Sequence, residues 1–313
     1  MDNLLVVGVD TVVGANLACC FAEHFHVSTW AADPGYEIAN CDALDPTATA
    51  SRVVEIAAPK WIVYCGPAAR SAWEPGTRDQ ITDDVVAEAQ DWATVARKHN
   101  ARFVMISSDA VFTGPWMFHD EESHGHCHSY QAEVLRAIEA QVCENHPEAL
   151  ILRTNAFGWS ADPARKGWIE TLLQHVETRR VVEQDHIRHA TPILATDLAE
   201  IVLRAIQEDL TGTFHIAGAE RVSPLKFTQR LASQFDLPWL AMRKETDQAL
   251  CEVPTEFGEG ECSLQTKAIR KALCVAMPLL SEGLERLREQ AENGYRDRLV
   301  AAGPQSAQQR RAA

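Results

Sequence analysis

Short apolar segments alternate with amphipathic segments through the first half of the chain, and this alternation restricts the fold more than any other feature. Buried strands are predicted at residues 4–8, 27–30, 61–64, 103–106 and 150–152, and helices at residues 16–24, 83–99 and 130–143. Short continuous apolar runs are typical of parallel strands that are covered on both faces. Because parallel strands are joined by crossovers, the pattern predicts an α/β fold with a Rossmann-type doubly wound parallel sheet.

The pattern changes after residue 158. The elements predicted there are helices at 168–178, 195–206 and 224–235, strands at 180–182 and 213–216, and a charged helix at 281–299. We therefore expect a Rossmann domain over residues 1–158 and a smaller carboxy-terminal α/β substrate lobe over residues 159–300, partly interleaved with the first. Residues 301–313 are rich in Ala, Gln and Arg, lack periodicity, and are expected to be disordered.

Composition bears on partners and compartment. The formal net charge is -15, and both nucleic acids and anionic membranes require a basic face, so neither is expected as a partner. The nine cysteines are scattered without a metal-type C-x-x-C pair, which indicates a reduced, cytoplasmic protein. The chain enters its first strand without a basic leader and has no apolar run long enough to span a bilayer, so no targeting segment or transmembrane helix is expected.

A glycine loop, Gly8-Val9-Asp10-Thr11-Val12-Val13-Gly14, follows the first strand and opens the first helix. Gly8 allows a tight turn, Gly14 allows close packing of helix on strand, and free N–H groups of the helix can meet a pyrophosphate. A three-glycine loop would have glycine at Thr11. The alternative is ordinary turn chemistry after a buried strand. The acid that reads the ribose is not evident, since Asp33 precedes Pro34-Gly35 and is equally a turn residue, so the cofactor stays open between NADP and NAD.

Several segments, in order along the chain, carry a resemblance to a known family. They are residues 42–46, 59–63, 106–114, 152–154, 191–199 and 212–218. Through them the chain resembles the dTDP-4-dehydrorhamnose reductase family of extended short-chain dehydrogenases, with an RmlD-like substrate-binding domain. That family includes sugar-nucleotide reductases and a non-catalytic regulatory subunit of methionine adenosyltransferase.

The resemblance implies a site and a mechanism. Ser108 matches the hydroxyl residue that orients the substrate carbonyl, Tyr130 matches the proton donor, and Val134 stands where the family has a lysine that lowers the tyrosine pKa. Valine has no charge with which to do this. The positions matched to cofactor binding are Gly8, Thr11, Gly14, Asp42, Ala43, Cys65 and Gly66.

Two functions follow from the resemblance. The first is an NAD(P)-dependent reductase acting on a nucleotide-linked 4-keto sugar, with a degraded catalytic set. The alternative is a non-catalytic nucleotide-binding or regulatory protein on the same scaffold, with either a homodimer or a regulatory partner left open. The acidic stretch 255–261 stands where the family carries arginines and would repel a sugar nucleotide's diphosphate.

Each candidate residue also has a plainer interpretation. Ser108 can cap a turn, Tyr130 can be an aromatic residue at a helix start, and Cys65 is expected to pack rather than react. The segment 191–197 is expected to line a cleft facing Ser108 and Tyr130. A stretch with metal-ligand residue types is interpreted as solvent-exposed, with no metal: it contains His119, His124, His126, Cys127 and His128.

Overall fold

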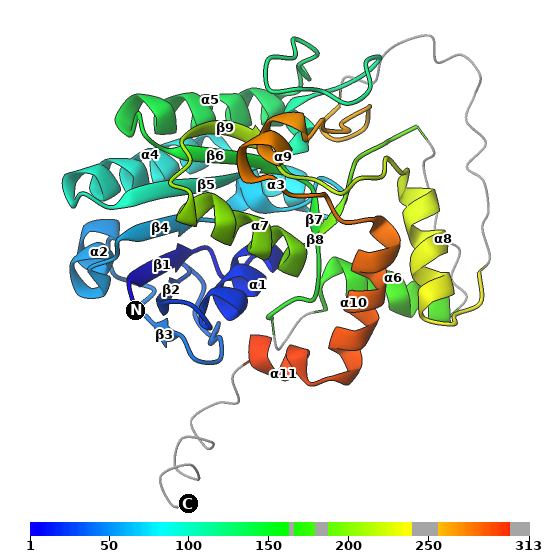
Figure 1. The fold of residues 1–313 in the computed structure, drawn as a ribbon, viewed down its shortest axis with the longest axis horizontal. Coiled ribbons are helices and arrows are strands. Elements are labelled where there is room, and N and C mark those ends of the chain that lie inside the picture. The colour runs from blue at the N-terminus through cyan, green and yellow to red at the C-terminus, as the bar shows by residue number, and fades with distance from the viewer. Residues whose placement is uncertain (163–165, 179–186, 240–255, 301–313) are drawn as a thin grey trace, which may run out of the picture.

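The computed structural model describes residues 1–162, 166–178, 187–239 and 256–300 (Figure 1). Within these residues, seven parallel strands form the central sheet. In spatial order they are β3 (Asp42–Ala43), β2 (His26–Trp30), β1 (Asn3–Val7), β4 (Trp61–Tyr64), β5 (Arg102–Ser108), β6 (Leu150–Thr154) and β9 (Gly212–His215). The order reverses direction at β1, and helices cover both faces, so the predicted Rossmann-type doubly wound sheet is confirmed.

Alternation along each central strand divides the core into two layers. In β1, Leu4 and Val6 face one hydrophobic cluster while Leu5 and Val7 face the other. Successive side chains of a strand point to opposite faces, so a strand buried on both sides must be apolar throughout. This is why the strand residues appear in the sequence as continuous apolar runs.

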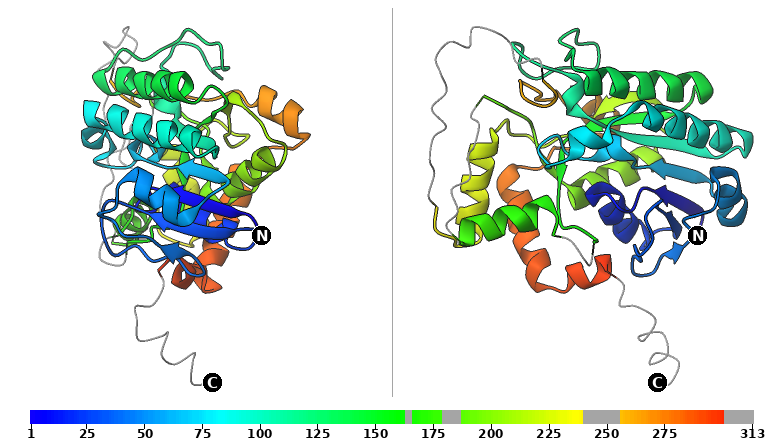
Figure 2. Two further views of the ribbon diagram at one scale, coloured as in Figure 1. Left: turned by 90° about the vertical axis from the view of Figure 1, so that its left-hand side faces the viewer. Right: turned by 180° about the vertical axis from the view of Figure 1, so that it is seen from behind.

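Helices from different parts of the chain cover the two faces (Figure 2). The face lined by Leu5 is covered by α2 (Ala50–Ala57), α4 (Asp83–Lys98) and α5 (Tyr130–Asn145), whose buried residues join that cluster. The opposite face is covered by α1 (Val12–Phe21) and α7 (Ala195–Gln207), with α10 (Leu280–Glu292) packed beside them. The predicted helix boundaries in the first half differ from these by only a few residues, except at α1, which begins earlier.

The carboxy-terminal half builds a smaller α/β lobe and also completes the sheet, because β9 pairs with β6. The lobe contains α6 (Trp168–Glu177), α8 (Pro224–Gln234) and a two-stranded parallel pair, β7 (Ala156–Phe157) with β8 (Ile193–Leu194). Shorter helices are α3 (Thr77–Gln80), α9 (Lys267–Leu273) and the 3-10 turns η1 (Pro67–Ala69) and η2 (Asp109–Val111). The division at residue 158 stays a prediction.

The single helix expected over 281–299 is two helices, so that prediction was wrong. Helix α10 ends at Glu292, and α11 (Tyr295–Leu299) follows a turn in which Gly294 has a φ of 78°. Glycine adopts this left-handed conformation without a Cβ clash, and the Asn293 side chain accepts the Tyr295 N–H at 3.0 Å. The turn brings Tyr295 back onto α1.

Two further predictions, the strand at 180–182 and the disordered tail at 301–313, lie outside the described residues. Among the residues that are described, no helix combines the length and the apolar character needed to cross a membrane.

Candidate functional site

The glycine loop is shaped by close backbone contacts. Gly8 has a φ of 87°, and its N–H donates to the Trp30 carbonyl at 2.8 Å, which ties the loop to the end of β2. A Cβ on Gly8 would overlap the carbonyl oxygen of Cys65, and a Cβ on Gly14 would overlap that of Gly8. Both glycines are therefore required by the loop itself, whatever it binds.

Thr11 caps the first helix. Its hydroxyl oxygen accepts the Gly14 N–H at 3.0 Å and lies 2.8 Å from the Gly8 carbonyl and 3.2 Å from the Cys65 carbonyl, to which it donates. An N-cap hydroxyl satisfies one of the free N–H groups that open a helix. The side chain is buried, so Thr11 supports the loop from the protein side and closes it onto the end of β4. A contact of Thr11 with a cofactor stays a prediction.

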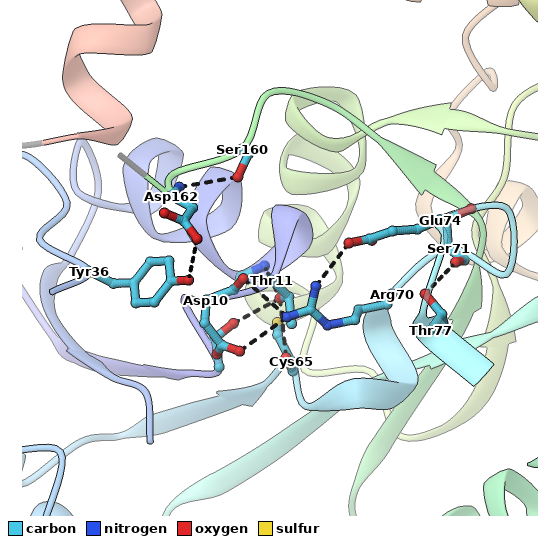
Figure 3. Close-up of polar contacts among 12 residues, drawn as sticks. Asp10, Thr11, Tyr36, Cys65, Arg70, Ser71, Glu74, Thr77, Ser160 and Asp162 are labelled. Carbon is cyan, nitrogen blue, oxygen red and sulfur yellow. Dashed lines mark hydrogen bonds and ion pairs between the residues drawn. The ribbon is translucent and has the colours of Figure 1, made fainter. Parts of the chain in front are cut away.

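A cluster of ion-paired side chains lies next to the glycine loop (Figure 3). The sequence analysis did not identify it. The Arg70 guanidinium lies 3.3 Å from both the carboxylate and the carbonyl oxygen of Asp10, and 2.9 Å from the carboxylate of Glu74. Burial raises the pKa of Asp10 and of Glu74, and Arg70 partly offsets that effect at each. One guanidinium thus links the glycine loop to the segment after β4, where a phosphate would compete with Asp10 for it.

An acidic rim continues from Asp10 toward the segment after β2. The Tyr36 hydroxyl donates to the Asp162 carboxylate at 3.1 Å, which joins that segment to the one preceding α6. Burial raises the pKa of Tyr36 to about 12, and the charges of Asp162, Asp10 and Asp33 add to the increase. Carboxylates thus gather where a ribose is usually bound.

The other residues matched to cofactor binding fall into two groups. Cys65 and Gly66 follow β4 and lie directly against the glycine loop. Burial raises the pKa of the Cys65 thiol, with the Asp10 charge adding to it, which agrees with packing and not with a nucleophile. Asp42 and Ala43 instead form β3 at the edge of the sheet, where they are exposed and separated from β1 by β2.

Ser108 belongs to a buried chain of hydrogen bonds at the ends of the central strands. Its hydroxyl accepts the Ala110 N–H at 3.1 Å and donates to Asp109 at 3.4 Å. Asn155 donates to the other Asp109 oxygen at 3.0 Å and accepts from Ser71 at 2.7 Å. Burial raises the pKa of Asp109 to about 7, against the opposing effect of the hydrogen bonds from Asn155 and Ser108. The turn-capping interpretation of Ser108 therefore describes its present contacts.

Tyr130 begins α5 and is half exposed. Partial desolvation raises its pKa, and a hydrogen bond to the Asp83 carboxylate at the start of α4 raises it further. Val134 lies one turn later and is buried in the cluster between α5 and the sheet. Within the described residues, no hydrogen bond joins Tyr130 to Ser108, and no cation stands at Val134 to favour a tyrosinate.

A cavity of about 430 Å³ opens beside the ion cluster. The segment after β4 contributes Trp73 and Glu74, while α6 and α8 contribute Trp168 and Phe227. The Phe227 ring lies edge-on to Trp73 with centroids 5.8 Å apart, and its centroid is 5.7 Å from that of Trp168. Ligand pockets of this size typically combine aromatic walls with a few polar groups, and here Lys166, His175 and Arg188 also line the space.

Two other predictions concern the segment 191–197 and the acidic stretch 255–261. Asp197 pairs with Arg286 of α10 at 2.6 Å, and the cleft expected between the segment 191–197 and Ser108 and Tyr130 stays a prediction. In the acidic stretch, Glu256 pairs with Arg78 at 2.5 Å and Glu261 pairs with Arg221, while Thr255 lies outside the described residues. The repulsion expected there is therefore partly neutralised.

The histidine stretch is packed against an aromatic ring. His119 stacks on Phe112 with centroids 4.6 Å apart, and His126 stacks at 5.7 Å, so the interpretation as a wholly solvent-exposed stretch was wrong. His119 is buried, and burial lowers its pKa. In the described parts of the chain, no three His, Cys, Asp or Glu side chains are arranged to hold a metal ion.

The sequence analysis missed the residues that line the cavity and the arginine between cavity and loop. Arg70 and Trp73 lie in the connection after β4, and function is often carried by connections at the ends of parallel strands. That position was a usable signal. Trp168 and Phe227 gave none, because an aromatic residue near a helix start is ordinary core chemistry until the lobe is assembled.

Comparison with known proteins gives a consistent family signal. A model of the RmlD substrate binding domain family matches residues 1–290. The structure is similar to a dTDP-4-dehydrorhamnose reductase from Bacillus anthracis in complex with NADP, with a TM-score of 0.73 and 18% identity, over 93% of this chain and 100% of that chain. It is also similar to a hypothetical dTDP-4-dehydrorhamnose reductase from Sulfolobus tokodaii, with a TM-score of 0.70 and 20% identity, over 90% and 98% of the two chains. These likenesses establish a shared fold.

The curated proteins that match this chain in sequence have a different name from these solved structures. Methionine adenosyltransferase 2 subunit beta of Xenopus laevis is 24% identical over 185 residues, which is 57% of this chain and 55% of that protein. The protein of the same name from Danio rerio is 24% identical over 216 residues, which is 66% of this chain and 65% of that protein. The chain thus spans little more than half the length of the first of these relatives.

Proposed function

Because the chain belongs to the RmlD substrate binding domain family, we propose that it binds a nicotinamide dinucleotide, NADP or NAD, over the Gly8–Gly14 loop and a nucleotide-linked sugar in the adjoining cavity. The observation that carries this proposal is the position of Arg70 and Glu74. Arg70 contacts the loop at Asp10, and its partner Glu74 lines the cavity. The two sites share a wall, as a reaction between coenzyme and sugar requires.

The residues of the loop fit a dinucleotide. Gly8 and Gly14 leave no room for a Cβ, and the loop opens α1, whose N-terminal N–H groups and dipole favour an anion. The Asp10 carboxylate opposes a pyrophosphate, while the Arg70 guanidinium attracts one. When bound, the nicotinamide ring supplies or accepts a hydride.

The cavity fits the nucleotide part of a sugar nucleotide. Trp73 and Trp168 offer apolar ring surface to a base, and the buried Phe227 ring packs against both. The buried Trp168 Nε1 has no hydrogen-bond partner among the residues that the structure describes, so an acceptor on the ligand would satisfy it. Lys166 and Arg188 supply positive charge for a diphosphate.

Turnover with a 4-keto sugar is expected to be absent or very slow. Tyr130 holds its proton more tightly than an ordinary tyrosine, because partial desolvation and Asp83 both raise its pKa. A general acid–base step contributes about 10²–10⁴ in rate, and Val134 supplies no charge to support one. The proposed function is therefore a reductase-type site with degraded chemistry.

Direct titration tests the proposal. NADH and NADPH are titrated into the purified protein by calorimetry, and dTDP-glucose is then added as a non-reacting probe of the cavity. We expect saturable binding of one coenzyme and of the probe. If neither coenzyme binds at about 1 mM, where a Kd of that size would half-fill the site, the proposal is wrong.

Asp10→Asn sharpens this test. Removing the carboxylate leaves Arg70 paired with Glu74 but no longer opposed by a charge on the loop, so coenzyme Kd is expected to fall roughly tenfold, equivalent to about 1.4 kcal/mol. Asp91→Asn on the exposed side of α4 is the matched control and is expected to leave Kd unchanged. Weaker binding by Asp10→Asn would mean that Asp10 holds the loop in its binding shape and does not repel the ligand.

A second function is favoured by one observation, the buried Val134. A scaffold that keeps its binding walls but lacks the catalytic cation suits a nucleotide-binding regulatory protein, and the relatives at 24% identity are named as subunits of methionine adenosyltransferase 2. Brisk reduction of a 4-keto sugar nucleotide, abolished by Tyr130→Phe, would eliminate this second function.

A further inference from the structure

An exposed apolar tip projects from the segment between η2 and α5, which stands at the top of the molecule in Figure 1. The tip consists of Trp116, Met117 and Phe118, which are 69%, 60% and 43% exposed. They are three of the seven exposed large hydrophobic residues in the described parts of the chain, and the only ones that are consecutive. Contiguous exposed apolar surface usually marks an interaction site.

The tip is held in place at its base. The Phe118 N–H donates to the Ser263 hydroxyl at 2.9 Å, and the His119 N–H donates to the Ser263 carbonyl at 2.8 Å. Farther along, the Glu121 carboxylate accepts the His215 N–H of edge strand β9 at 3.0 Å. These hydrogen bonds fix the segment against the residues before α9 and against the sheet edge, so the side chains of the tip are presented by a supported loop.

A hollow of about 290 Å³ lies next to the tip. Phe118, Leu264 and Met277 give it apolar walls, and Lys267 and Arg270 of α9 contribute two exposed cations. Neither cation makes an ion pair with any residue that the structure describes. In a chain of net charge -15, two unpaired cations beside an apolar hollow form a local basic site.

The tip and the hollow have complementary chemistry. The tip is apolar and is followed by the exposed acids Asp120 and Glu122, whereas the hollow is apolar and bordered by cations. No ion pair within the described residues joins these acids to Lys267 or Arg270. Trp, Phe, Met and Arg, which make up much of this surface, are the residues enriched in protein interfaces.

We propose that this surface joins two copies of the chain, with Trp116 and Met117 of each tip seated in the hollow of the other copy. A two-fold axis between tip and hollow makes both contacts at once, because an isologous interface uses one self-complementary patch twice. The occupant is a second copy because one patch of this chain contains both the apolar–acidic part and the apolar–basic part. This inference does not depend on the proposed ligands.

Complementary charge reversal tests the proposal. One variant carries Asp120→Lys with Glu122→Lys, and the other carries Lys267→Glu with Arg270→Glu. Each alone sets like charges against each other at both contacts, so we expect its dimer Kd to rise at least about tenfold. Mixed in equal amounts, the two variants form a heterodimer with opposite charges at both contacts, and dimerisation should return.

The measurement is sedimentation equilibrium at about 100 μM chain, which populates a dimer with a Kd of about 1 μM. Glu285→Lys with Glu289→Lys on the exposed side of α10 is the matched control and should remain dimeric. Trp116→Ser with Met117→Ser should be monomeric. A monomeric wild-type protein, a dimer that both reversals leave intact, or a mixture that stays monomeric would each overturn the proposal.

Discussion

At the residue scale, the site depends on how single side chains are paired. Arg70 is shared between Asp10 and Glu74, so its charge is already engaged next to the glycine loop. Thr11 turns its hydroxyl into the protein to cap α1, although its position in the loop suggests a ligand contact. The chemistry of these residues is set by their partners more than by their type.

Asp109 carries a prediction at this scale. Its pKa in the folded protein is about 7, above the value of about 3.9 for an unfolded chain, because burial favours the neutral acid. As pH rises from about 4 to about 7, only the unfolded chain releases the proton, so folding stability falls across that window. Asp109→Asn has no such proton and should lose less stability over the same range.

The measurement is the midpoint of urea unfolding between pH 4 and pH 8 for the wild type and for Asp109→Asn. The exposed Asp91→Asn on α4 serves as the control and should follow the wild type. Parallel pH profiles for the wild type and Asp109→Asn would show that the carboxyl ionises freely in the folded protein.

At the element scale, α5 illustrates how one apolar side and an N-cap hold a helix in place. Ser129 caps it by accepting the Ala132 N–H, and Leu135, Ile138 and Val142 bury one side against the sheet. Val134 extends that apolar side by one residue. Val134, where the resemblance implies a lysine, therefore contributes to the packing of the helix.

Val134→Lys is predicted to destabilise the protein without restoring turnover. A lysine at a buried apolar position must lose its proton or disturb the packing, and we expect a loss of roughly 2 kcal/mol or more. Ala137→Lys, at an exposed position of the same helix, is the matched control and should change stability little. The check is thermal unfolding together with a reductase assay, and fast turnover by Val134→Lys would contradict the prediction.

At the scale of the whole molecule, the last described helix fastens the lobe to the glycine-loop helix. The Tyr295 hydroxyl donates to Asn16 of α1 at 2.9 Å, and Asn16 donates to the Trp159 carbonyl at 2.9 Å. Residues nearly the length of the chain apart therefore meet at the helix that follows the glycine loop. The turn at Gly294 allows this contact because it redirects the chain after α10.

Tyr295→Phe tests this fastening. It removes the buried hydrogen bond to the side-chain oxygen of Asn16, which is worth about 1 kcal/mol. The Tm is therefore expected to fall by roughly 2–4 °C. Tyr130→Phe, which removes a half-exposed hydroxyl, should leave the Tm close to that of the wild type. An unchanged Tm for Tyr295→Phe would show that α11 contributes little to the fold.

Local sequence was sufficient for the main strands and helices of the first half of the chain, but not for the break at Gly294 within the helix predicted at 281–299. Strands such as β4 and helices such as α4 are encoded by short-range periodicity and by glycine, which is why their predicted bounds nearly coincide with those observed. Tertiary structure decided the contacts that local patterns do not contain. Arg70 reaches Asp10, and Asp197 pairs with Arg286. Trp73 and Phe227 line one cavity. These contacts join residues far apart in the chain. They depend on how the lobe packs against the sheet, and no periodicity within one segment records that packing.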